Sequence, residues 1–210
     1  MTRLVLVHGL GVSGRYFDPL VRELREFETV RPDLRRFVTV EEQAEALGES
    51  VEPGTPMLGN SLGCQVIAEL AAREPGFVER AIFVGPTVDR RHRSWLDQAG
   101  RLLLDSTRER PSLTAIVVRD YLGANPFRIM RSARSALDDA LERKVTALEG
   151  PLLVVRGERD PLCPKDWAEE LARRAPRGRL KVVPGAAHAV HHSHPEALGA
   201  LVRSFLQETT

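Results

Sequence analysis

The sequence predicts an α/β protein built on a parallel sheet. Up to Val84, short apolar runs alternate with segments whose apolar residues recur at helical spacing, a pattern typical of parallel strands with helices on both faces. From residue 87 to residue 149 this alternation stops and helical segments follow one another. Two more apolar runs come after that stretch. We therefore expect one domain, residues 1–210, with about six parallel strands and a helical insertion after the fourth.

The strands and the helices between them can be placed in chain order. Pro32-Asp33 and Gly85-Pro86 supply the turn residues that end the second and fourth strands. The second and sixth strands are expected at the two edges of the sheet. The expected strands span residues 3–8, 28–31, 56–59, 80–84, 151–155 and 180–183. The expected helices outside the insertion span residues 16–27, 40–52, 62–73 and 196–207.

The inserted segment, residues 87–149, is expected to form a helical lid over the strand ends. Pro111 and Pro126 separate its stretches of helical spacing, which extend over 93–109, 112–122 and 126–148. A mostly apolar roof of this kind favours an apolar or mixed substrate. Its candidates to line a substrate pocket are the aromatic side chains Trp95, Tyr121 and Phe127.

A glycine-flanked serine lies between the third expected strand and the helix that follows it. The residues Gly59-Asn60-Ser61-Leu62-Gly63 fit the pattern Gly-x-Ser-x-Gly, in which a strained turn lifts the serine hydroxyl clear of the sheet. The flanking glycines are required because strand and helix pass too close for a Cβ atom. Ser61 is therefore a candidate nucleophile. The alternative is a turn serine that caps the helix.

Two further candidate catalytic residues follow later strands. A nucleophilic serine needs a histidine base and a carboxylate that orients it, in the chain order serine, acid, histidine. Asp160 follows the fifth expected strand and His188 follows the sixth. Because the carboxyl ends of parallel strands meet at one edge of the sheet, these side chains should converge with Ser61. Glu158 is the competing acid, but Asp160 lies further into the loop and has more reach.

In these motifs the chain resembles the α/β-hydrolase superfamily. The resemblance covers most of the sequence and includes a first strand that ends in His8-Gly9. It implies an α/β-hydrolase fold with a catalytic triad. Ser61 would be the nucleophile, Asp160 the orienting acid, and His188 the general base and acid.

The same resemblance implies an oxyanion hole made of the backbone N–H groups of Leu10 and Leu62. Leu62 begins a helix, where the helix dipole favours negative charge. We expect His8 to hold the loop that follows the first strand and carries Leu10, here called the oxyanion loop, rather than to act as a second base. The superfamily usually has two more strands before the one that ends in His-Gly. This chain has no room for them, so a reduced sheet is expected.

The histidines allow a rival hypothesis, because four of the six lie between residues 188 and 194. Such density can indicate a metal site. The sequence contains no His-Glu-x-x-His motif, however, and Cys64 and Cys163 lie far apart. We therefore expect no metal, and we interpret His191, His192 and His194 as the approach to the last helix.

Composition limits the partners and the compartment. A hydrophobic content of 42% and a net charge of +1 are typical of a soluble globular protein and give no reason to expect nucleic acid. No apolar run is long enough to span a membrane, and no signal peptide precedes the first strand. Two cysteines without local partners favour a reducing compartment. We expect a cytoplasmic protein that acts on a small molecule.

The motifs together predict a serine hydrolase of carboxylesterase type. It should cleave carboxylic esters or thioesters of small, largely apolar acids through an acyl-enzyme, with no metal or organic cofactor. One alternative is a carbon–carbon bond hydrolase of the meta-cleavage-product type, which the Gly-Asn-Ser-x-Gly form resembles. Those enzymes usually carry an aromatic residue where this chain has Ala189. Another alternative is a non-catalytic ligand-binding protein on the same fold.

Overall fold

Six parallel strands form a single sheet in the computed structural model, which describes residues 2–208. The strand order β2-β1-β3-β4-β5-β6 places the two expected edge strands at the edges. The predicted sheet is confirmed. The strands are β1 (Arg3–Val7), β2 (Glu28–Val30), β3 (Met57–Asn60), β4 (Ala81–Val84), β5 (Leu152–Gly157) and β6 (Gly178–Val183).

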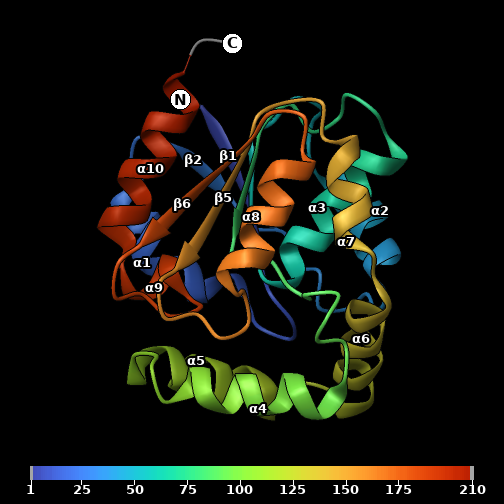
Figure 1. Ribbon diagram of the computed structural model, residues 1–210, viewed down its shortest axis with the longest axis vertical. Coiled ribbons are helices and arrows are strands. Elements are labelled where there is room, and N and C mark those ends of the chain that lie inside the picture. The colour runs from blue at the N-terminus through green and yellow to red at the C-terminus, as the bar shows by residue number, and fades with distance from the viewer. Residues whose placement is uncertain (1, 209–210) are drawn as a thin grey trace.

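Helices cover both faces of the sheet (Figure 1). Alternate residues of each central strand point to opposite faces, so Leu4 and Leu6 enter one apolar core and Val5 and Val7 enter the other. The first core is completed by α1 (Asp18–Glu23), α9 (Val190–Ser193) and α10 (Pro195–Gln207). The second is completed by α2 (Val40–Ser50), α3 (Leu62–Arg73) and α8 (Lys165–Arg174).

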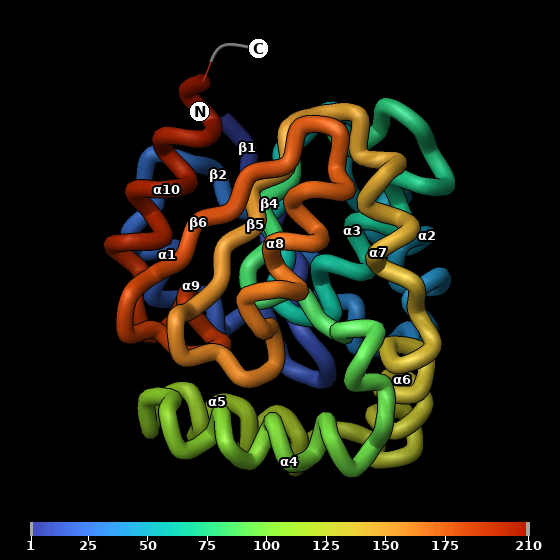
Figure 2. The backbone as a smooth tube through the Cα atoms, in the orientation of Figure 1, coloured from blue at the N-terminus to red at the C-terminus, as the bar shows by residue number. Residues whose placement is uncertain are grey.

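The inserted segment crosses the edge of the sheet toward which β5 and β6 point. Figures 1 and 2 show α4 and α5 below these strand ends, with α6 to one side. This position brings the insertion next to the loops that follow the strands. Its three longer helices are α4 (Trp95–Ser106), α5 (Pro111–Leu122) and α6 (Pro126–Asp138).

The last part of the expected lid belongs to the body of the protein. The helix predicted over 126–148 is wrong beyond Asp138, because the chain turns into extended backbone at Asp139. Two short elements follow, α7 (Leu141–Lys144) and the 3-10 turn η2 (Val145–Ala147), and both pack against α3. Leu141 and Val145 are fully buried in the core there. The rest of the insertion is α4 and α5 below the strand ends, with α6 to one side.

Two other helices differ from the prediction. The helix expected over 16–27 is divided into the 3-10 turn η1 (Gly14–Phe17) and α1, since Pro19 starts a new helical turn. The helix α8 had not been predicted, although Trp167, Ala168, Leu171 and Ala172 recur at helical spacing and are buried. No helix within residues 2–208 is long and apolar enough to span a lipid bilayer.

Candidate active site

Ser61 occupies a strained turn between β3 and α3. Its backbone has φ 56° and ψ −120°, and it is the one non-glycine residue with positive φ among residues 2–208. The flanking glycines allow this close turn, since a Cβ on Gly59 would lie 2.6 Å from the carbonyl carbon of Gly63. The hydroxyl Oγ of Ser61 lies 3.1 Å from Oγ1 of Thr87, in the loop after β4. The turn therefore presents the hydroxyl at the carboxyl edge of the sheet.

Asp160 and His188 are paired at the same edge. The atom Oδ2 of Asp160 lies 2.9 Å from Nδ1 of His188, and the carboxylate has no side-chain exposure. Its other oxygen accepts hydrogen bonds from the backbone N–H groups of Leu162, at 2.8 Å, and Cys163, at 3.0 Å. Glu158 is turned elsewhere, because it accepts from the backbone N–H of Gly185. The structure brings Asp160, and not Glu158, to the histidine.

The charges around His188 favour its protonated form. Burial opposes the charged imidazolium, but Asp160, with Asp105 and Glu109 of the insertion, outweighs burial and raises the pKa of His188 to about 9. Burial likewise opposes ionisation of Asp160, but the His188 charge and hydrogen bond lower the pKa of that carboxyl. Such a pair holds the ring with Nδ1–H directed at the carboxylate and leaves Nε2 for a reacting group.

The loop after β1 is held by buried hydrogen bonds. The atom Nε2 of His8 accepts from the backbone N–H of Leu34 at 3.0 Å, so Nδ1 carries the proton and donates to the carbonyl of Gly9 at 2.8 Å. The hydroxyl of Tyr16 accepts from Gly9 N–H at 2.8 Å and donates to Oδ1 of Asn60 at 3.0 Å. The side chain of His8 thus serves to hold this loop in place.

A cavity of about 710 Å³ opens beside the candidate oxyanion hole. Leu10 and Leu62 both lie in its wall. The lid was expected to give a mostly apolar lining, but charged side chains take a large share of the cavity wall. Four arginines and two aspartates line it. These charged lining residues are Arg35, Arg36, Arg119, Arg128, Asp33 and Asp120.

The three aromatic residues expected to line a pocket lie outside this wall. Trp95 is 44% exposed and Phe127 is 74% exposed. The hydroxyl of Tyr121 donates to the carbonyl of Leu10 at 3.1 Å. Tyr121 therefore contacts the loop after β1 from outside the cavity, and neither Trp95 nor Phe127 lines the cavity.

The comparison with known families agrees with this geometry. Residues 4–201 match the sequence profile of the alpha/beta hydrolase family. The chain belongs to the alpha/beta hydrolase family. It is an α/β-fold hydrolase similar to carboxylesterases.

Curated relatives and solved structures are similar over nearly the whole hydrolase chain. A pimeloyl–acyl-carrier-protein methyl ester esterase of Neisseria meningitidis is 27% identical, over 98% of this chain and 77% of the relative. A biotin biosynthesis bifunctional protein of Cellvibrio japonicus is 26% identical over 99% of this chain, which spans 48% of that relative. A thermophilic esterase of Thermogutta terrifontis superposes with a TM-score of 0.79 at 21% identity, over 99% of this chain and 90% of the other. This last likeness shows the fold.

Sequence patterns did not reveal three residues near the candidate site of the hydrolase. Asn60 lies inside the glycine-flanked motif, and its amide also donates to the carbonyl of Val84 at 2.9 Å. It therefore links the turn at Ser61 to β4, and through Tyr16 to the loop after β1. Its position next to Ser61 in the motif could have identified Asn60 as a residue near the site. Tyr16 and Thr87 carried no signal, because loop packing alone brings them to the site.

The three histidines after His188 occupy separate environments in the hydrolase. His191 is fully buried with its ring centroid 4.3 Å from that of Tyr16 and 4.7 Å from that of Phe17. The ring of His192 hydrogen-bonds to the hydroxyl of Ser112, and His194 leads into α10. Within residues 2–208 no group of three or more histidine, cysteine or acidic side chains is placed to hold a metal ion. His191 and His192 lie in the short helix α9, and His194 is the N-cap residue of α10, so the segment leads into the last helix as expected.

Proposed function

We propose that this hydrolase is a serine esterase that acts through an acyl-enzyme on Ser61. The observation that carries the proposal is the buried Asp160–His188 pair at the sheet edge where the strained turn presents Ser61. Three adjacent strands, β3, β4 and β5, support this edge, and the loop after β6 supplies the histidine. The arrangement supports the proposed roles of nucleophile for Ser61, base for His188 and orienting acid for Asp160 in acyl transfer.

Acylation and deacylation follow from these roles. Oγ of Ser61 attacks the ester carbonyl carbon while Nε2 of His188 takes the hydroxyl proton. The backbone N–H groups of Leu10 and Leu62 stabilise the negative oxygen of the tetrahedral intermediate. The carbon–oxygen bond to the alcohol then breaks, and the alcohol leaves with the proton from His188. Water repeats the sequence on the acyl-enzyme and releases the acid, with His188 again taking and returning one proton.

The cavity beside the oxyanion loop is proposed to take the acid part of the ester. Its charged wall has four arginines against two aspartates. Arg35 is paired with Asp33, whereas Arg36 and Arg119 form no ion pair with a carboxylate within residues 2–208. Guanidinium groups of this kind suit a carboxylate or phosphate. We infer that the preferred acid carries an anionic group, which replaces the largely apolar acid expected from the sequence.

Methyl esters are the first substrates to test, because the Neisseria relative is named as a methyl ester esterase. Hydrolysis of half methyl esters of dicarboxylic acids should be compared with methyl esters of monocarboxylic acids of equal length, and with the matching thioesters. A fluorophosphonate should label the native protein at Ser61, and Ser61→Ala should abolish both labelling and turnover. Equal labelling of native protein, denatured protein and His188→Ala would refute the acyl-enzyme.

The cytoplasmic location expected from the sequence stays a prediction.

A further inference from the structure

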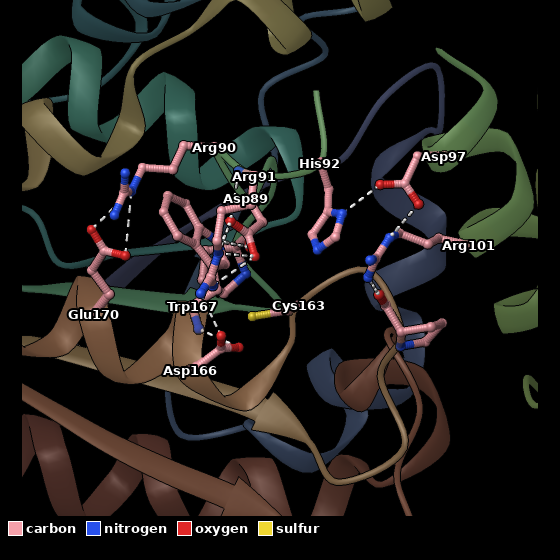
Figure 3. Close-up of polar contacts among 12 residues, drawn as sticks. Asp89, Arg90, Arg91, His92, Asp97, Arg101, Cys163, Asp166, Trp167 and Glu170 are labelled. Carbon is pink, nitrogen blue, oxygen red and sulfur yellow. Dashed lines mark hydrogen bonds and ion pairs between the residues drawn. The ribbon is translucent and has the colours of Figure 1, made fainter. Parts of the chain in front are cut away.

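The second half of α4 and the turn that follows it contact the backbone on both sides of Asp160. The guanidinium of Arg101 donates to the carbonyl of Pro161 at 2.6 Å, and that of Arg108 donates to the carbonyl of Arg159 at 2.5 Å. Figure 3 shows Arg101 between this loop and Asp97, whose carboxylate accepts from it at 3.0 Å. One helix of the insertion therefore holds the loop that carries the candidate acid.

The same part of the insertion, the end of α4 and the turn after it, also holds the loop that carries His188. Oδ1 of Asp105 accepts from the backbone N–H of His188 at 3.1 Å. Oε1 of Glu109 accepts from the backbone N–H of Ala189 at 2.5 Å. The main chain at His188 and Ala189 is thus held by two carboxylates, while the side chain of His188 is held by a third, Asp160.

The segment that precedes α4 forms ion pairs with the body of the protein. Figure 3 shows Arg90 directed at Glu170 and Arg91 directed at Asp89 and Asp166. Glu170 and Asp166 belong to α8, which packs on β5 and β6. The helix is therefore supported at both ends, and its contacts with the two loops have a fixed base.

Burying these carboxylates is costly unless an opposite charge compensates them. Asp105 is 7% exposed, and Oε2 of Glu109 is buried without a hydrogen-bond partner within residues 2–208. Burial raises the pKa of both carboxyls, that of Glu109 to about 7. A tether for two backbone N–H groups would need only a neutral acceptor oxygen, such as an amide supplies. Carboxylates at both positions add negative charge beside a group that becomes positive, and His188 becomes positive during acyl transfer.

We propose that Asp105 and Glu109 are positioning residues for His188, holding its loop in place and stabilising its imidazolium by their charge. This inference rests on the proposed function, in which His188 takes the proton of Ser61. The charged groups that face His188 are Asp160 from the loop after β5, Asp105 from α4 and Glu109 from the turn after α4. Arg108 acts on Asp105 with the opposite sign, and His191 from α9 lies within electrostatic range.

Amide variants separate the charge from the tether. Asp105→Asn and Glu109→Gln each keep an acceptor oxygen for the backbone N–H and remove the negative charge. The matched control is Asp138→Asn on α6, where the carboxylate forms an exposed ion pair with Arg134. For each variant we would record the NMR titration of the His188 ring, the pH dependence of fluorophosphonate labelling at Ser61, and the melting temperature.

The proposal predicts that each amide variant titrates His188 about one pH unit lower than the wild type and moves the acid limb of labelling by the same amount. Asp138→Asn should leave both unchanged. Titration curves of Asp105→Asn and Glu109→Gln that coincide with the wild type would overturn the proposal. The two residues would then only hold the backbone of the His188 loop by hydrogen bonds. If Asp105→Asn does not fold, Glu109→Gln alone decides between these results. A lowered titration without any labelling at Ser61 would support the charge effect and refute the esterase function instead.

Discussion

A Cβ atom on Gly85 would lie 2.8 Å from Nδ1 of His188. The same atom would lie 3.0 Å from Oδ2 of Asp160, so Gly85 leaves the space in which the pair is formed. Gly85 follows β4, and its backbone N–H donates to the carbonyl of Val155 on β5 at 2.8 Å. The position is therefore fixed by the sheet, and a side chain there could not move aside without displacing the pair.

Gly85→Ala should reduce kcat/KM by roughly 10²-fold, the loss associated with a displacement of about 1 Å in a catalytic group. Gly76→Ala is the matched control, since Gly76 also has positive φ but nothing within 4 Å of its Cβ position. Both variants should lose stability from backbone strain. Only Gly85→Ala should lose activity at a temperature where both remain folded, as checked by circular dichroism. Equal activity of the two variants would contradict the assigned role of this space.

Asp160→Asn should reduce kcat by roughly 10³- to 10⁴-fold, because the charge that stabilises the imidazolium is lost. Glu158→Gln should change kcat little, since Glu158 accepts from Gly185 and does not contact His188. Steady-state kinetics on the best ester would measure both variants. The reverse pattern would show that the carboxylate was assigned wrongly.

The wild-type pH profile should have its acid limb well above the ordinary histidine pKa of about 6.5. The three carboxylates raise the pKa of His188 to about 9, and the general base must be neutral in the free enzyme. The value of kcat/KM should therefore rise from pH 7 toward pH 9. A plateau already reached at pH 7.5 would show that the imidazolium is not stabilised to this extent.

Tyr121→Phe should lower kcat by roughly 2- to 10-fold, which is the value of one hydrogen bond. The lost bond is the one from the Tyr121 hydroxyl to the carbonyl of Leu10, in the loop that carries a proposed oxyanion donor. Because Tyr121 does not line the cavity, the preference among acids should stay the same. Trp95→Phe, at a position 44% exposed, is the control and should keep the wild-type kcat. A changed preference in Tyr121→Phe would place this residue at the substrate after all.

His191→Phe should stabilise the protein and raise its melting temperature by roughly 2–8 °C. Both ring nitrogens of His191 are buried without a hydrogen-bond partner within residues 2–208, and burial holds its pKa well below the ordinary value. The unfolded chain therefore binds the proton more readily, so wild-type stability should fall as the pH drops below about 6.5. The gain in the variant should grow in that range. Thermal melts would measure the gain, with His194→Phe at a partly exposed position as the control for introducing a phenylalanine.

The sequence by itself determined the six strands, their parallel arrangement and the placing of Ser61, Asp160 and His188 after three of them. These features depend on local periodicity and on turn residues, and parallel topology then brings the strand ends to one edge. Only the tertiary structure decided which acid meets the histidine, that polar and charged residues line the cavity, and that α4 holds the loops of both Asp160 and His188. Those contacts join residues such as Asp105 and His188, which are 83 positions apart, and no periodic pattern encodes how an inserted helix docks. They depend on the shape and charge of surfaces that exist only once the sheet and the insertion have packed together.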